Sequence, residues 1–187
     1  MVPKKSIPGI EVQDNKREQA LVALLGLQPT GRRGGYDAFD EAGNPFELKT
    51  TSKNDVGTGR DVGRDFVAKL RSEYFVAAKT DPNSNEWKPA QIIICHPDDL
   101  EEWIQEKLEF RLAKDENLLE RVMNKIKNLF ANEELERISY LMSRGMTYNN
   151  PKISWDYLEK HGTVLNLKEP AKSLKKFVSQ RPLLNQK

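Results

Sequence analysis

The feature that most constrains the fold of this chain is a strand–turn–strand pattern in residues 36–52, YDAFDEAGNPFELKTTS. The polar turn DEAGN separates two short runs that favour extended backbone, so the sequence predicts a β-hairpin. Side chains alternate along a strand, so Glu47 and Lys49 point to one side, at a cleft or on the face away from the core. Across the hairpin, we expect Asp37 to lie near Glu47.

This arrangement has two interpretations. Two carboxylates that converge within a few ångströms repel each other unless a cation lies between them. Oxygen ligands from Asp37, Glu47 and the backbone carbonyl of Leu48 suit Mg²⁺, and Lys49 beside the metal can orient or deprotonate an attacking water. The alternative is an ordinary cross-strand ion pair on the surface, which contributes only about 0–1 kcal/mol to stability.

The rest of the chain predicts a mixed α/β domain with its sheet in the middle. A helix through KREQALVALLGL ends at Gly26 or Pro29, and the short helix DFVAKLRS is expected to be capped by Asp65. EYFVAAK and AQIIIC have strand composition, and Pro97 opens the next helix. Apolar residues then recur at helical spacing to about Arg144. An order of helix, hairpin, helix, two strands and helices is typical of the α/β class.

Length and composition exclude several classes of protein. The 187 residues suit a single domain. The chain lacks an apolar run of about 18 residues that could cross a membrane. Its first residues, MVPKKSIPGIEV, lack the apolar region of a secretory signal. The single cysteine, Cys95, excludes an internal disulfide, so we expect a protein of the reducing cytoplasm.

The charge distribution is more informative than the net charge of +2, because 30 basic residues nearly balance 28 acidic ones. Residues 98–136 are rich in acids, whereas the loops at 31–33, 49–53 and 60–71 and the segment 168–181 are basic. A protein that grips phosphates on one face has such a distribution, and so has an ordinary protein surface.

Four segments resemble one known family. GRRGGYDAFDEAGNPFELKTTS resembles the active-site hairpin of the PvuII-type restriction endonucleases, members of the PD-(D/E)xK nuclease superfamily. VQDNKREQALVALLGL resembles the family's approach to that hairpin, HPDDLEEW its helix start after the core strands, and NNPKISWDYLEKHGT its DNA-reading turn and final strand. The resemblance implies a restriction-endonuclease-like α/β core spanning 1–187, with a central mixed sheet flanked by helices.

The same resemblance implies an activity. At matching positions it makes Asp37 and Glu47 the metal-binding carboxylates for Mg²⁺ and Lys49 the catalytic lysine. It implies a Type II restriction endonuclease, a homodimer that straddles a palindromic or near-palindromic site in double-stranded DNA and hydrolyses both strands to 5′-phosphate and 3′-hydroxyl ends. A prokaryotic cytoplasm and a companion DNA methyltransferase are also what the family implies.

The resemblance also assigns DNA-binding residues. Asn149 and Asn150 fall on the family's asparagine pair in the major groove, and an asparagine amide can bond both N6 and N7 of adenine. On their own they indicate a turn, next to the candidate DNA contact Lys152. Asp14 and Asn15 fall where the family places a minor-groove and interface contact, and they also fit a helix cap.

The loop after the hairpin departs from the family. GTGRDVGRD stands where the PvuII type has a histidine-rich recognition loop. Arg60 and Arg64 can each bind guanine through O6 and N7, and Asp61 can accept from cytosine N4. The alternative role for the arginines is to clamp phosphates, which positions the protein without specifying a sequence.

Two further departures concern assembly. The N-terminal helix through which the relatives dimerise lacks a counterpart in the short segment before Val12, and 112–144 has the pattern of a helical insertion with one apolar stripe. We hypothesise that this helical hairpin replaces the missing dimer contact; packing on its own subunit is the alternative. Residues 168–187 are expected to be a basic C-terminal tail, solvated and loose.

Two other functions fit the same residues. A structure-selective repair or junction-resolving nuclease of the same superfamily would share the acid–acid–lysine set and ignore DNA sequence. A DNA-binding module without catalysis would keep Glu47 and Lys49 as a salt bridge. It would bind DNA in EDTA and would not cleave DNA with any metal.

Overall fold

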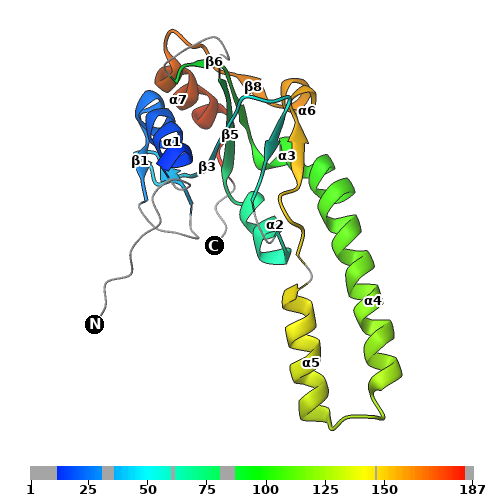
Figure 1. The fold of residues 1–187 in the computed structure, drawn as a ribbon. Coiled ribbons are helices and arrows are strands. Elements are labelled where there is room, and N and C mark those ends of the chain that lie inside the picture. The colour runs from blue at the N-terminus through cyan, green and yellow to red at the C-terminus, as the bar shows by residue number, and fades with distance from the viewer. Residues whose placement is uncertain (1–11, 31–35, 60–61, 81–86, 146, 184–187) are drawn as a thin grey trace, which may run out of the picture.

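The computed structural model has the mixed α/β arrangement that the sequence predicts (Figure 1). It describes residues 12–30, 36–59, 62–80, 87–145 and 147–183, without the side chains of 12–15 and 144–145. The strands are β1 (Gln28–Pro29), β2 (Ala38–Phe39), β3 (Pro45–Thr51), β4 (Asp55–Gly57), β5 (Tyr74–Thr80), β6 (Pro89–Cys95), β7 (Lys152–Ser154) and β8 (Thr163–Val164). The helices are α1 (Val12–Leu25), α2 (Arg64–Leu70), α3 (Pro97–Trp103), a π-helical turn η1 (Ile104–Glu109), α4 (Phe110–Ile126), α5 (Asn132–Gly145), α6 (Trp155–His161) and α7 (Pro170–Gln180).

Six strands form one sheet in the order β1-β2-β3-β5-β6-β8. Strands β3 and β5 pair in parallel, and the other neighbours in this sheet are antiparallel, so the sheet is mixed. A separate antiparallel ribbon joins β4 to β7. The predicted hairpin is confirmed, because β2 and β3 are antiparallel, with Ala38 opposite Phe46.

Helices cover both faces of the sheet (Figure 1). On one side, the α1–α7 core contains Leu21, Leu25, Phe46, Leu48, Val76, Ile94, Leu174 and Phe177. On the other side, the α2–α3–α6 core contains Val67, Leu70, Phe75, Ala77, Ile93, Leu100, Trp103 and Leu158. Both faces are therefore apolar over most of the sheet, and Glu47 and Lys49 interrupt the second one.

Local sequence signals explain where several helices begin and end. Helix α1 ends before Gly26, whose φ of +67° is a left-handed conformation that glycine adopts without strain. Helix α3 begins at Pro97, and His96 and Asp99 close a capping box around its first turn. The expected Asp65 cap is wrong, because α2 begins at Arg64 and Asp65 lies inside its first turn.

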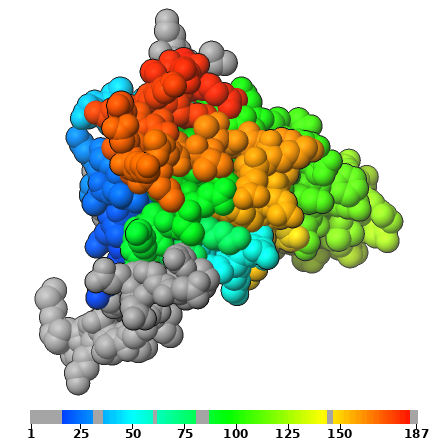
Figure 2. Space-filling view, turned by 90° about the horizontal axis from the view of Figure 1, so that it is seen from above, coloured from blue at the N-terminus to red at the C-terminus, as the bar shows by residue number. Residues whose placement is uncertain are grey.

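The prediction of a loose, solvated tail at 168–187 is also wrong for its described part. Residues 170–180 form α7, and Leu174 and Phe177 bury their side chains in the α1–α7 core. Leu174 and Phe177 are three residues apart, on one side of the helix, and the lysines around them in the sequence lie on its exposed side. In Figure 2 the residues of α7, in orange and red, lie next to those of α1, in blue.

The predicted helices of 112–144 are confirmed as α4 and α5, which pack against each other and extend away from the sheet (Figure 1). Several large apolar side chains on this helical hairpin are exposed: Phe110, Leu118, Leu129, Phe130, Tyr140, Leu141 and Met142. Whether this pair forms a dimer contact stays a prediction. In the described part of the chain, every helix is too short or too polar to cross a membrane.

Candidate active site

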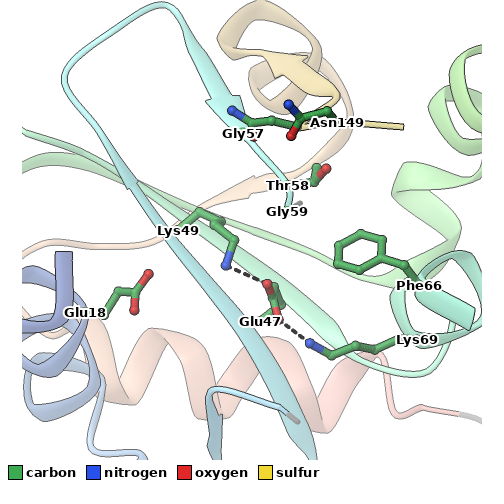
Figure 3. Close-up of a pocket in the computed structure, with 10 residues that line it drawn as sticks. Glu18, Glu47, Lys49, Gly57, Thr58, Gly59, Phe66, Lys69 and Asn149 are labelled. Carbon is green, nitrogen blue, oxygen red and sulfur yellow. Dashed lines mark hydrogen bonds and ion pairs between the residues drawn. The ribbon is translucent and has the colours of Figure 1, made fainter. Parts of the chain in front are cut away.

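A cavity of about 620 Å³ opens beside β3, between α2 and the β4–β7 ribbon (Figure 3). Five parts of the chain contribute its lining, which are α1, β3, the end of β4 with the following residues, α2 and the turn before β7. The lining residues are Glu18, Glu47, Lys49, Gly57, Thr58, Gly59, Phe66, Lys69, Asn149 and Asn150. Two of the three predicted catalytic residues, Glu47 and Lys49, therefore share one cavity with the predicted asparagine pair, whereas the third, Asp37, is not among the residues that line it.

Strand β3 brings Glu47 and Lys49 to this cavity. Glu47 is paired with Phe75 and Lys49 with Ala77 on β5, so both charged side chains lie on the side of the α2–α3–α6 core. The prediction that they share one side is confirmed. Glu47 is only 4% exposed, which makes the surface ion-pair interpretation wrong for this carboxylate.

The Lys49 ammonium lies among three oxygen atoms. Its Nζ is 2.5 Å from Glu47 Oε1, 3.5 Å from Asp37 Oδ2 and 3.1 Å from the Leu48 carbonyl oxygen, to which it donates. Burial opposes the charged form of Lys49, but attraction to Glu47 and Asp37 outweighs it and raises the lysine pKa above its ordinary value. These three oxygens belong to the three residues that the sequence predicts as metal ligands.

Asp37 is held in this position by the hairpin. Its backbone N–H donates to the Phe46 carbonyl at 3.0 Å, and its Oδ2 accepts from the Leu48 backbone N–H at 2.8 Å. The carboxylate thus bridges the two strands and faces Lys49. Asp37 and Glu47 thus lie within 3.5 and 2.5 Å of the same Lys49 ammonium, which agrees with the expectation that Asp37 lies near Glu47.

Lys69 and Glu73 also belong to this site, although the sequence motifs did not indicate them. Lys69, on α2, places its Nζ 2.5 Å from Glu47 Oε2, so two lysines hold the Glu47 carboxylate, one on each oxygen (Figure 3). Glu73, four residues further along, is fully buried 3.7 Å from Lys69, and neither of its oxygens has a hydrogen-bond partner. Burial first, and repulsion from Glu47 second, raise the pKa of Glu73 to about 9. The spacing of Lys69 and Glu73, at i and i+4, was the sequence signal that could have indicated a contact between them.

The oxygen donors around Lys49 bear on whether this site can hold a divalent cation. In the described residues, there is no group of three or more His, Cys, Asp or Glu side chains placed to hold a metal ion. Two carboxylates and a backbone carbonyl nevertheless converge on one positive charge, that of Lys49. Hard oxygen donors around a cation are the chemistry that Mg²⁺ accepts, so the residues present fit this ion if Lys49 moves aside.

The asparagine pair lies in the turn before β7. Asn149 and Asn150 are exposed and line the cavity, and Asn150 has a φ of +50°, which asparagine tolerates better than most residues. Lys152 is different, because its Nζ forms an ion pair with Asp55 at 2.9 Å and it lines a second cavity, not the one with Glu47.

The other predicted DNA-binding residues do not all come together. The Arg64 guanidinium donates two hydrogen bonds to the Glu116 carboxylate on α4, from Nε at 2.8 Å and from Nη2 at 2.7 Å. Both of these nitrogen donors are therefore occupied within the chain. Arg60 and Asp61 lie outside the described residues, as do the side chains of Asp14 and Asn15. The backbone of these last two lies inside α1, so the helix-cap interpretation is wrong for them.

No family model matches the sequence, and no curated protein matches it significantly. Residues from the hairpin motif and from the asparagine turn meet in the cavity.

Proposed function

We propose that this protein is a Mg²⁺-dependent, sequence-specific DNA endonuclease of the Type II restriction class, with a restriction-endonuclease-like fold. The observation that carries the proposal is the shared cavity, in which Glu47 and Lys49 lie with Asn149 and Asn150. The first two residues supply the means to hydrolyse a phosphodiester, and the second two supply amides that can bind base edges. These pairs come from distant parts of the chain and meet only in the folded molecule.

In the proposed mechanism, Asp37, Glu47 and the Leu48 carbonyl would hold Mg²⁺. When bound there, the ion would supply Lewis-acid chemistry at a phosphoryl oxygen. Three oxygen atoms around the Lys49 ammonium support this assignment, because the same donors can exchange one cation for another.

Lys49 then positions the attacking water. In the structure, Glu47 and Asp37 raise the pKa of Lys49, so the lysine that would move aside for the ion starts as a charged donor, a form that can orient a water but cannot take its proton. Lys69 keeps one oxygen of Glu47 in place, which leaves the other for the cation. Attack in line with the leaving oxygen gives 5′-phosphate and 3′-hydroxyl ends.

The proposal includes a homodimer on a short palindromic or near-palindromic DNA site, because two equivalent cavities are needed to cut two antiparallel strands. The apolar side chains exposed on the α4–α5 hairpin fit the hypothesis that this pair replaces the dimer contact. Sizing the intact chain beside a version without residues 113–143 tests it, and a dimer that survives the deletion contradicts it. A companion DNA methyltransferase belongs to the same proposal.

A plasmid digest tests the activity directly. The protein is incubated with plasmid DNA and Mg²⁺, beside an EDTA control, and the fragment ends are sequenced. We expect discrete fragments whose ends share one short symmetric sequence, and no cleavage in EDTA. Asp37→Asn and Lys49→Ala should both abolish cleavage but still bind the same sequence. Comparable cutting by either variant contradicts these assignments.

One observation favours a second candidate, a DNA-binding module without catalysis. Glu47 is held by two lysines, and a buried carboxylate between two ammonium groups can serve stability alone. This candidate predicts sequence-specific binding in EDTA and intact plasmid with every divalent metal. A smear, or cleavage confined to branched DNA, identifies the structure-selective nuclease instead.

A further inference from the structure

Gly57, at the end of β4, lies directly under the side chain of Asn150. A Cβ atom built on Gly57 would lie 2.1 Å from Asn150 Oδ1, 2.9 Å from its Cγ and 3.0 Å from its Nδ2. Real Cβ atoms essentially never lie closer than 3.0 Å to another heavy atom. The Asn150 amide therefore occupies space that the side chain of any other residue at position 57 would fill. Exchanging the amide oxygen and nitrogen does not relieve the contact.

The backbone of the asparagine turn is held on both sides. Thr58, which is fully buried, donates to the Pro151 carbonyl twice, from its backbone N–H at 3.0 Å and from its Oγ1 at 2.9 Å. On the other side, Val62 and Tyr148 exchange two backbone hydrogen bonds of 3.0 and 2.8 Å. The turn is thus fixed at each end to the segment that follows β4.

Glycine is not needed at position 57 for its own backbone. The φ of Gly57 is outside the left-handed region, and its neighbours in β4 pair regularly with β7. A strand residue with a side chain would normally be better here, because glycine weakens a strand. The absent side chain therefore matters for the approach of Asn150, which stays exposed at the cavity.

We propose that Gly57 and Thr58 are positioning residues that set the orientation of the Asn150 amide over the cavity and so decide which base the protein accepts there. This inference rests on the proposed DNA-reading role of Asn150. Neither residue has to touch DNA. Gly57 supplies the space in which the amide lies, and Thr58 fixes the turn that carries it.

The test compares Gly57→Ala with the intact protein. The added methyl displaces the end of a flexible side chain, so we expect the fold to survive and the amide to move. The probes are duplexes that carry the site recovered from the plasmid digest, and the same duplexes with one base pair changed at each position in turn. We expect discrimination at one position of each half-site to fall about tenfold or more, and discrimination at the others to stay.

Four further substitutions make the result specific. In an Asn150→Gly background, which keeps a left-handed turn without the amide, Gly57→Ala should change discrimination no further. Gly63→Ala is the matched control, because its Cβ meets only Thr147 at 3.7 Å, an ordinary contact, and it should leave discrimination unchanged. Thr58→Val should loosen discrimination at the same position as Gly57→Ala, and Thr58→Ser should restore it.

The NMR signal of the Asn150 side-chain NH₂ group, identified by its loss in Asn150→Gly, reports the position of the amide without any cleavage assay. A shifted signal in Gly57→Ala with unchanged discrimination overturns the inference while leaving the nuclease proposal intact. If Gly57→Ala does not fold, Thr58→Val and Thr58→Ser decide the question in the same assay. If the intact protein cuts or binds all duplexes equally, the proposed function itself is wrong, and the inference with it.

Discussion

Two clusters of charged residues in this molecule make similar contacts in different surroundings. The cavity cluster, made of Asp37, Glu47, Lys49, Lys69 and Glu73, is largely buried beside β3. The foot cluster, made of Arg64, Arg71, Glu101, Glu109 and Glu116, ties α2 to α3, η1 and α4 at the base of the helical hairpin. Its side chains are partly exposed.

The difference lies in which protonation state each site favours. In the foot cluster, hydrogen bonds from Arg71 hold the pKa values of Glu101 and Glu109 below normal, so every partner keeps its charge. In the cavity cluster, burial and repulsion raise the pKa of Glu73 to about 9, while Lys49 is held charged by its neighbours. The partly exposed cluster therefore keeps its glutamates charged, whereas the buried cluster contains a glutamate that is held protonated.

The largest expected difference comes from removing one glutamate in each cluster. Glu47→Ala should reduce cleavage by at least about 100-fold and destabilise the fold by about 3 kcal/mol, because two ammonium groups lose their main partner. Glu109→Ala should cost about 0–1 kcal/mol and leave cleavage unchanged. Cleavage rates, taken well below the melting temperature, measure the effect on activity. Urea unfolding measures the effect on stability. Equal effects in the two variants would remove the distinction between the clusters.

The next difference is in the direction of the pH dependence. Glu73 has a folded pKa of about 9 against an ordinary value of 4.5, so the folded state binds more protons and the stability that this group contributes is lost as pH rises from about 4.5 to 9. Glu73→Gln mimics the protonated form. The stability of this variant relative to the intact protein should therefore increase as pH rises across this range. The carboxylates of the foot cluster have lowered pKa values, so their contribution is lost as pH falls below 4.5.

Urea unfolding of both proteins between pH 5 and pH 9 measures this difference. The slope due to Glu73 is at most about 1.4 kcal/mol per pH unit. Glu101→Gln serves as the control, because the stability that it removes should be constant between pH 5 and pH 9 and should shrink only as pH falls below 4.5. Parallel stability curves for Glu73→Gln and the intact protein would mean that Glu73 is ionised in the folded state.

The smallest expected effect tests the foot cluster alone. Arg71 forms two hydrogen bonds with Glu101 and one with Glu109, a geometry that lysine cannot reproduce. Arg71→Lys should therefore destabilise the protein by about 1 kcal/mol or less, with a smaller effect at high salt. Cleavage at saturating Mg²⁺ should stay normal. A loss of cleavage would show that the two clusters are coupled through α2.

Sequence patterns predicted the elements whose signals are local. The hairpin was predicted from its turn residues, the end of α1 from Gly26, and the start of α3 from Pro97. Helix α7 was missed because its lysines dominate the composition, and only the packing of Leu174 and Phe177 against the sheet makes it a buried helix. The guanidinium of Arg64 has its partner on α4, far along the chain, which composition and spacing do not indicate.

The sequence by itself determined that Glu47 and Lys49 share one side of a strand with Asp37 opposite, because side-chain alternation and turn chemistry act over a few residues. Only the tertiary structure decided that Lys69 holds the second oxygen of Glu47 and that the asparagine turn lies at the same cavity. Burial and charge pairing depend on which distant segments pack together, and neither is encoded in the spacing of a single motif.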